Sequence, residues 1–373
     1  MIPRTRKTRR PSACLALALA AVLLAGCWDK AELNELAIVT MIGLDEDPET
    51  GQKTVYYQIV NPLTSVTTSS TTGGDQAPVY TYKVSGKSLG EIRKTAYKML
   101  PRKLFIAYYR AVVVSERTAR HGLRDMVNII QIQPTGRASV PVLIAGESME
   151  KVMSTLTPLE MYPGESVSLR LNLLRKQSML VGKRIAVRDV TERMERSECV
   201  VLPILETVGE APSPEFSRMT GTVDAGVSNL RITGGAVIRD YKMTARLNDD
   251  QLVDYFLLLG NKGWFTKQFM VEGRPVTMNA KLGRYSRKLG ETPQIKLHLD
   301  LAFHFAIEYM PQSEAELARV EREIANQIRD ELQEFCRKAK ELGVTLPKIQ
   351  NPEDVRVEVN AHLEHTSKLT EPF

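Results

Sequence analysis

The chain has 373 residues, of which 43% are hydrophobic and 25% are charged, a balance typical of globular proteins rather than disordered or collagen-like ones. Its net charge of +6 comes mostly from the first 26 residues, which carry five Lys or Arg and no acid. The remaining 45 basic and 44 acidic residues leave a net charge of +1, too little for the basic surface of a nucleic-acid-binding protein. We therefore expect no nucleic-acid partner, and roughly 345 residues are enough for two or three domains.

The first 26 residues have the features of a secretory signal. Five cations precede an apolar run that is too short to span a bilayer. Leu24, Ala25 and Gly26 then lead into Cys27, which is the pattern of a lipobox. In this interpretation signal peptidase recognises these three residues, and Cys27 becomes the lipid-bearing first residue of the mature chain. The alternatives are ordinary cleavage near Ala20 or Gly26, or an uncut signal anchor.

The chain has four cysteines, and two of them are assigned to the leader and the lipid. Cys14 leaves with the leader, and Cys27 carries the lipid. Cys199 opens the apolar run CVVLPIL, and Cys336 lies on the apolar side of a predicted helix. These positions favour two buried free thiols. A Cys199–Cys336 disulfide in an oxidising compartment is the alternative.

Folded structure is predicted to begin directly after Cys27. Asp29 and Glu32 have the spacing of a capping box, which predicts a short helical turn. The next residues, AIVTMIGLDED, alternate as a strand, and TVYYQIV reads as a second strand pairing back on the first. No flexible polar tether separates the lipid from the fold. The protein is therefore expected to lie close to the bilayer, with a partner in or on that membrane.

Residues 27–195 are predicted as an N-terminal α/β domain. Residues 61–78 are rich in Ser, Thr and Gly and predict a mobile surface loop. After the strand VYTYKVS, Ser88 caps a helix that runs to Leu100. There follow the buried strand LFIAYYRAVVVS, the helix RTARHGLRDMVNII, the strand SVPVLIAG and a helix that begins at Ser148. A hairpin followed by β-α-β-α-β implies a mixed sheet.

Residues 196–265 are predicted as a middle α+β domain. CVVLPILETV reads as a strand and is followed by a Gly/Pro/Ser-rich loop. Two further strands, joined by a tight turn at Arg239 and Asp240, precede a helix that begins at Asp249. Gly260 is placed to end that helix.

Residues 266–373 are predicted as a C-terminal α+β domain with one long helix over 313–342. Strands are expected around 276–282 and 294–308, and VRVEVNAHLEH is expected to close the sheet. Ser313 starts the helix and Gly343 ends it. Apolar residues recur on the helix every three or four positions, which predicts a stripe buried against an antiparallel sheet. The alternative is an exposed stripe that binds a partner.

Motifs for catalysis or metal binding are weak. The chain has no Gly-x-Ser-x-Gly and no His-Glu-x-x-His. SGKS lacks the earlier glycine of a P-loop, and DEDPETG lacks the turn glycine of a calcium loop. His298 and His304 would lie about 20 Å apart along one strand, and His362 and His365 read as surface residues. We predict no catalytic residue, metal or cofactor, and a cell-envelope enzyme stays an alternative.

The opening motif resembles that of the Ger(x)C family of spore germination lipoproteins, the C subunits of nutrient germinant receptors. The family pattern is Gly-Cys-Trp-Asp, a charged pair, Glu-Leu, and a strand that ends in Gly-Ile/Leu-Asp. The matching residues here are Gly26, Cys27, Trp28, Asp29, Glu32, Leu33, Gly43, Leu44 and Asp45. GGAVIRDYKMTARL and the long helix extend the resemblance, whereas the tryptophans that the family usually carries before its closing strand are missing.

The resemblance implies a membrane-tethered, non-catalytic subunit that is needed for nutrient-triggered germination. It implies three α/β domains around separate sheets, and assembly with multi-spanning A- and B-type subunits. The expected location is the outer face of the inner spore membrane. A solute-binding lipoprotein is the alternative, but such a protein would have two similar α/β domains and a tether, and the sequence predicts neither.

Overall fold

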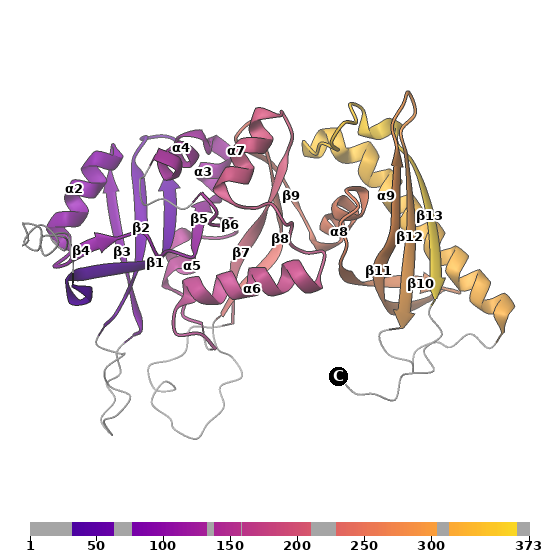
Figure 1. Cartoon of the computed structure of the whole chain (residues 1–373), viewed down its shortest axis with the longest axis horizontal. Coiled ribbons are helices and arrows are strands. Elements are labelled where there is room, and N and C mark those ends of the chain that lie inside the picture. Colours follow the sequence, from indigo (N-terminus) through magenta and orange to yellow (C-terminus); the bar gives the residue numbers. More distant parts are fainter. Residues whose placement is uncertain are drawn as a thin grey trace, which may run out of the picture.

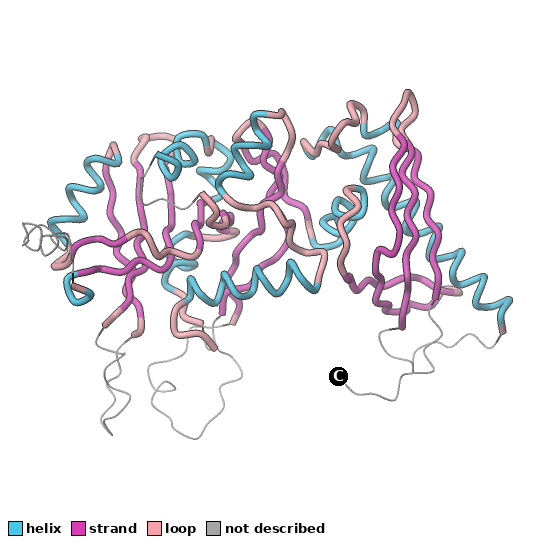
Figure 2. The backbone as a smooth tube through the Cα atoms, viewed as in Figure 1, coloured by secondary structure: helices cyan, strands magenta, loops and turns pink. Residues whose placement is uncertain are grey.

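A computed structural model describes residues 32–62, 77–132, 138–157, 159–209, 229–303 and 313–363. The described residues form two β-sheets flanked by helices, as Figures 1 and 2 show. The predicted mixture of α/β and α+β structure is therefore confirmed. The predicted signal peptide and most of the predicted loop at 61–78 lie outside the described residues.

The larger sheet has nine strands in the order β3-β2-β1-β5-β6-β7-β8-β9, and β4 pairs separately with β1. The central strands β1, β5, β6 and β7 run parallel, and antiparallel hairpin strands lie on either side. Parallel neighbours need crossover connections and are covered on both faces, which explains their nearly continuous apolar sequences. The strands are β1 (Leu36–Glu46), β2 (Lys53–Val60), β3 (Val79–Gly86), β4 (Lys103–Phe105), β5 (Ala111–Ser115), β6 (Val142–Ala145), β7 (Val200–Val208), β8 (Asn229–Arg239) and β9 (Lys242–Leu247).

Helices cover both faces of this sheet. Ser88 and Ser148 cap helices as predicted, each accepting a hydrogen bond of 3.2 Å from a backbone N–H three residues later. The described helical segments are η2 (Leu33–Glu35), α2 (Leu89–Met99), α3 (Glu116–His121), α4 (Arg124–Ile132), α5 (Met149–Ser154), α6 (Pro163–Gln177) and α7 (Val187–Glu195). A Cβ at Gly164 would lie 2.4 Å from the Thr40 carbonyl oxygen, so only glycine lets α6 approach β1 this closely.

Two predicted elements are each divided in the structure. The predicted strand over 104–115 is split into β4 and β5, because β4 pairs with the start of β1 and β5 with its later part. The segment between β4 and β5 is longer than the stretch of β1 between the residues with which they pair. The additional residues therefore form a connection rather than a continuous strand. The predicted helix over 117–130 is split into α3 and α4. Between them the Leu123 N–H donates to the Tyr241 carbonyl (2.7 Å) instead of continuing the helix.

The middle segment does not form the separate sheet that the family resemblance implied. β7 pairs in parallel with β6, with Ile144 opposite Ile204, so the larger sheet continues past residue 195. The reason lies in β7 itself, because its first six residues are all buried and need cover on both faces. The division of the chain into domains at residues 195 and 265 stays a prediction.

The smaller sheet has the order β10-β11-β12-β13, with β10 (Trp264–Val271), β11 (Arg274–Lys288), β12 (Gln294–Phe303) and β13 (Arg356–Leu363). The sequence interpretation missed β10 as a strand. It was also wrong to expect an antiparallel sheet throughout, because β13 runs parallel to β12. The helix α9 (Glu314–Leu342) carries the chain back between these two strands, as a parallel connection requires.

The long helix α9 has the ends and the buried stripe that the sequence predicts. Ser313 Oγ accepts from the Glu316 N–H at 3.2 Å, and Gly343 ends the helix in a left-handed conformation with φ of 74°. The stripe packs into the core rather than facing solvent; its buried members are Val320, Ile324, Ile328, Leu332, Phe335, Cys336 and Ala339. Cys199 and Cys336 are both buried free thiols.

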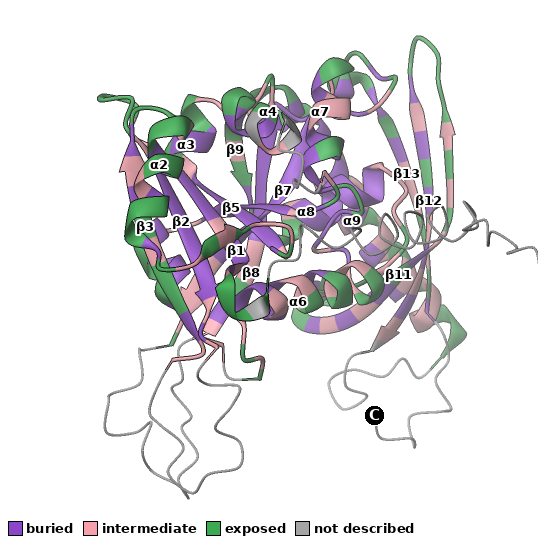
Figure 3. Cartoon of the chain, turned by 60° about the vertical axis from the view of Figure 1, so that its left-hand side comes forward, coloured by how far each residue is buried: buried purple, intermediate pink, exposed green. Residues whose placement is uncertain are grey.

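Two hydrophobic cores hold the fold together, and the second crosses from one sheet to the other. It contains buried residues of β7, β8, the helix α8 (Asp249–Leu258), the smaller sheet and α9. The Cys199 N–H donates to Thr345 Oγ1 at 2.7 Å, and Thr244 Oγ1 donates to the Leu342 carbonyl at 2.9 Å. Figure 3 shows buried residues along the strands of both sheets. The sheets are therefore joined by packing as well as by the chain.

Candidate functional site around the first strand

The predicted lipid-attachment residue Cys27 and its recognition residues Leu24, Ala25 and Gly26 lie outside the described residues. β1 begins at Leu36, nine positions after Cys27. Because an extended chain spans at most about 3.5 Å per residue, Leu36 lies within about 30 Å of Cys27. Figure 1 shows β1 at the left end of the molecule, beside β4 and α2. This end of the larger sheet is therefore the part of the described fold that Cys27 can reach most directly.

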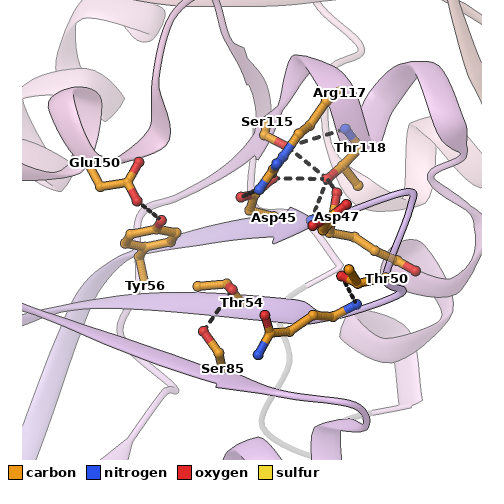
Figure 4. A network of polar contacts seen from close by, with 12 residues as sticks. Asp45, Asp47, Thr50, Thr54, Tyr56, Ser85, Ser115, Arg117, Thr118 and Glu150 are labelled. Atoms are coloured by element: carbon orange, nitrogen blue, oxygen red, sulfur yellow. Dashed lines mark hydrogen bonds and ion pairs between the residues drawn. The ribbon is translucent and has the colours of Figure 1, made fainter.

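The other end of β1 carries Gly43, Leu44 and Asp45, which match the family motif. Figure 4 shows Asp45 beside Ser115 and Arg117. The buried Asp45 carboxylate accepts hydrogen bonds from Ser115 Oγ (2.6 Å) and from Arg117 Nε (2.7 Å), and the Arg117 guanidinium makes a second, shorter contact. A carboxylate held by two nitrogens of the same guanidinium group is a strong, directional pair. Asp45 thereby ties the end of β1 to the beginning of α3.

Neighbouring polar groups complete this connection. Ser115 caps α3 by accepting from the Thr118 N–H at 3.2 Å, and Thr118 Oγ1 accepts from the Glu46 N–H at 2.7 Å. Burial opposes the ionisation of Asp45, but the hydrogen bonds from Arg117 and Ser115 outweigh it and lower the pKa of this carboxyl group. Asp45 is thus an ionised structural carboxylate, with its acceptor capacity used inside the protein.

A second group of polar residues links β2 to α5. Tyr56 Oη donates to Glu150 Oε1 at 2.8 Å, as Figure 4 shows. Lys83 Nζ lies 2.6 Å from the same oxygen. The hydrogen bond from Lys83, followed by that from Tyr56, lowers the pKa of Glu150 to about 2. Burial, reinforced by Glu150, raises the pKa of Tyr56. Glu150 is therefore a poor general base, and Tyr56 is held as a neutral donor.

The motif glycine also has a packing role. A Cβ at Gly43 would lie 2.9 Å from Met149 Sδ and 3.1 Å from Met153, so α5 rests directly on this part of β1. The motif residues Gly43 and Asp45 thus position α5 and α3 on the sheet. They do not converge on a vacant reaction centre.

A partly buried ionic cluster that the sequence interpretation missed joins α8, β10 and α9. Lys267 Nζ lies 2.5 Å from Glu331 Oε2 and 3.9 Å from Asp254 Oδ1. Burial raises the pKa of Asp254 to about 7, against the attraction of Lys267. Burial opposes the charge on Lys267, but Asp254 and Glu331 outweigh it and raise the pKa of this lysine. The sequence held little sign of this cluster, because β10 was not predicted.

The predicted histidines do not form a metal site within the described ranges. His298 lies 3.9 Å from Asp300, and His362 lies 3.2 Å from Glu321 on the surface. His304 and His365 are outside the described residues. In the described part of the chain, no three His, Cys, Asp or Glu side chains gather so as to hold a metal ion. Helices long and apolar enough to cross a membrane are likewise absent from the described segments.

A pocket lies beside the junction of the two sheets. Its volume is about 160 Å³, and its lining includes Arg184, Cys199 and Tyr255. Sites for small organic ligands usually measure roughly 300 to 1,000 Å³. This pocket is too small to support the solute-binding alternative.

Comparison with known families matches most of the chain. Residues 29–207 match the spore germination protein N-terminal domain, and residues 233–350 match the C-terminal domain described as spore germination B3/GerAC like. Spore germination protein KC of Bacillus subtilis (strain 168) is 28% identical over 196 residues, which cover 52% of this chain and 48% of that protein. The putative spore germination protein YfkR of the same organism is 21% identical over 248 residues, which cover 66% of this chain and 60% of that protein.

The chain thus spans about half the length of the first of these relatives and three fifths of the second. The alignment with a solved structure, the crystal structure of the GerBC protein, covers 87% of this chain and 96% of the GerBC chain. That alignment has 12% sequence identity and a TM-score of 0.48, too low to establish a common fold by itself. The two family matches together cover well over half of the chain, one on each side of the 208–232 segment. The chain therefore belongs to the Ger(x)C family of spore germination proteins.

Proposed function

We propose that this chain is the lipid-anchored C subunit of a spore germinant receptor. In this proposal Cys27 carries the lipid, and the subunit lies at the outer face of the inner spore membrane. It docks to multi-spanning A- and B-type subunits and is needed for nutrient-triggered germination. The observation that carries the proposal is the position of β1, which begins nine residues after Cys27 in a chain of this family. So short a connection keeps the larger sheet close to any membrane that holds the lipid.

The side chains around β1 support a scaffold role rather than a catalytic one. The Asp45 and Glu150 carboxylates are both held by cations, at distances typical of structural ion pairs. Their lowered pKa values leave neither group ready to accept a proton near neutral pH. The pocket at the sheet junction is small. We therefore propose a non-catalytic subunit that works through its contacts with other molecules.

Fatty-acid labelling tests the anchor. Wild-type protein should incorporate a metabolic fatty-acid label, and Cys27→Ala should not, because two acyl chains on this residue supply the stable attachment. Cys199→Ala is the matched control, since this thiol is buried and free and should not affect labelling. Label retained by the Cys27→Ala protein would refute the assignment of Cys27.

Co-purification from detergent-solubilised spore membranes tests docking. The wild-type chain should elute with multi-spanning subunits in one complex. A chain that elutes alone under conditions that preserve other membrane complexes would contradict docking. Saturable binding of amino acids, sugars or nucleosides by the isolated chain would instead support the solute-binding alternative.

A further inference from the structure

One surface at the Cys27-proximal end of the larger sheet combines exposed cations with exposed apolar side chains. We call it the basic face; it consists of Lys94, Tyr97, Lys98, Met99, Lys103 and Phe105. Tyr97 and Met99 are 48% and 49% exposed, and Phe105 is 36% exposed. The face comes from the second half of α2 and from β4, which contact each other.

The topology places the basic face beside the start of β1. β4 pairs in parallel with the first residues of β1, so Lys103 lies opposite Leu36 and Phe105 opposite Ile38. The end of α2 is joined to β4 by a short connection after Met99. Figure 1 shows α2 and the start of β1 at the same end of the molecule. The face is thus next to the point where the chain arrives from Cys27.

Positive charge is more concentrated in this segment than in the chain as a whole. Residues 92–115 include six Lys or Arg and no Asp or Glu, whereas residues 27–373 carry a net charge of +1. Of the six, Arg110 is paired with Glu165 on α6 at 2.7 Å. Within the described ranges, no carboxylate forms an ion pair with Lys94, Lys98 or Lys103. The nearby Glu32 and Glu35, in the turn before β1, do not neutralise these lysines by direct contact.

Ordinary roles explain only part of this pattern. Lys98 lies in the last turn of α2, where a cation is favourable to the helix dipole. Lys103 lies on a short edge strand, where lysine discourages pairing with other chains. Neither role accounts for a run of 24 positions without a carboxylate. Nor does either account for the exposed aromatic and methionine side chains among the lysines.

We propose that the basic face binds the surface of an anionic phospholipid bilayer and so fixes the orientation of the protein on the membrane. The lysines would meet the negative headgroups, and Tyr97, Met99 and Phe105 would enter the interfacial region, where aromatic side chains are favourable. The proposal rests on the lipid-anchored function proposed above, because the anchor places this face at the membrane. A lipid and a basic patch together attach a protein more durably than either alone.

Vesicle sedimentation with the mature chain carrying Cys27→Ala tests the face without the lipid. The wild-type face should bind phosphatidylcholine vesicles that contain about 30% phosphatidylglycerol, and should not bind pure phosphatidylcholine. Each cation near an anionic surface contributes roughly a fivefold increase in binding, so removing three should weaken the partition coefficient on the order of 100-fold. Raising the salt from about 0.05 M to about 0.5 M should weaken the wild-type binding, because the headgroup charge is screened.

The variant is Lys94→Gln with Lys98→Gln and Lys103→Gln. Its matched control replaces three exposed lysines elsewhere, Lys242→Gln with Lys288→Gln and Lys340→Gln, which gives the same net charge. Loss of binding in the first triple variant, with retention in the control, supports the proposal. Circular dichroism establishes that both proteins are folded. The salt titration of the unsubstituted face gives an answer even if the triple variant does not fold.

Three results would overturn the proposal. One is an absence of binding to anionic vesicles, and another is binding that is insensitive to salt. The third is an equal loss of binding in both triple variants. A face needed only for co-purification with the multi-spanning subunits would be assigned to a protein partner instead. Failure of the anchor is detected separately, by the fatty-acid label at Cys27, so the two proposals can be distinguished.

Discussion

Asp45 is a buried, charged residue of the larger sheet whose partners come from a distant part of the chain. It connects β1 to α3 through Ser115 and Arg117, which lie 70 and 72 positions away in the sequence. The motif around Asp45 was visible in the sequence, and it carried the family resemblance. The partners of Asp45 were not visible in the sequence, because no local pattern indicates which serine and arginine will contact a carboxylate so distant along the chain.

Replacing Asp45 should destabilise the fold measurably. Asp45→Ala removes the buried carboxylate that accepts from both Ser115 and Arg117, so we expect a loss of about 1 to 3 kcal/mol in the free energy of unfolding. Because the folded pKa of Asp45 is lowered, its contribution is present above the unfolded pKa of 3.8 and is lost as the pH falls through the folded value. Urea unfolding at pH 7 measures the loss. Glu49→Ala, an exposed turn substitution, should stay within about 0.5 kcal/mol, and an equal effect of both changes would contradict this role.

The contribution of Asp254 to stability should change with pH in the direction opposite to that of Asp45. Its folded pKa of about 7 lies above the unfolded value of 3.8, so its contribution is fully present below pH 3.8 and is lost as the pH rises towards 7. Asp254→Asn removes this loss. Relative to wild type, the variant should therefore gain on the order of 2 kcal/mol between pH 5 and pH 8. Urea unfolding of both proteins at the two pH values measures this difference.

The comparison of the two proteins cancels the contributions of other titrating groups. Asp125→Asn, an exposed change on α4, should show no such gain, because Asp125 is not among the charges that act on Asp254. An Asp254→Asn difference that is the same at pH 5 and pH 8 would show that Asp254 is already ionised at the lower pH.

Among the elements, α9 was the best predicted, because its caps and its apolar spacing are both local signals. Ser313 and Gly343 mark its ends in the sequence and in the structure. β10 was missed although Phe265, Phe269 and Val271 are buried on one side, because Lys267 lies between them on that side and interrupts the apolar alternation. The direction of β13 could not be read locally, since strand pairing depends on where α9 delivers the chain.

Truncation of the α9 stripe tests its place in the core. Ile328 is 2% exposed, so Ile328→Ala should cost about 2 to 5 kcal/mol through lost transfer energy and the cavity left behind. Denaturant unfolding of the mature chain with Cys27 replaced measures this cost. Arg322→Ala, on an exposed position of the same helix, should change stability by less than about 0.5 kcal/mol. A similarly small change for Ile328→Ala, together with lost receptor assembly, would make α9 a docking surface.

For the whole molecule, sequence patterns predicted the fold class but not how the parts join. The pairing of β6 with β7 and the packing of α8 between the two sheets are long-range contacts. Periodicity describes one element at a time, so it leaves such contacts undetermined. The candidate lipid site was predicted entirely from the sequence, and it remains a proposal.

Removal of the anchor should separate receptor function from a general envelope role. Spores with Cys27→Ala should lose most of their response to nutrients, because the subunit is no longer held beside its membrane partners. Their response to nutrient-independent triggers should stay unchanged. Germination measured by the loss of optical density under both kinds of trigger gives the result. An equal loss under both would indicate a role in the wall or envelope.

The junction between the two sheets has a mechanical consequence. Thr345 is hydrogen-bonded to Cys199, and Leu342 is hydrogen-bonded to Thr244. The Tyr285 hydroxyl group donates to the Leu258 carbonyl at 2.9 Å. The first two contacts join the larger sheet to the end of α9, and the third joins α8 to the smaller sheet, so the junction is held at more than one point. A load applied at the start of β1 would therefore reach α9 through packed and hydrogen-bonded groups as well as through the connecting chain. If the start of β1 faces the membrane, as proposed above, a tilt of that end should be passed on to α9 rather than absorbed at the junction.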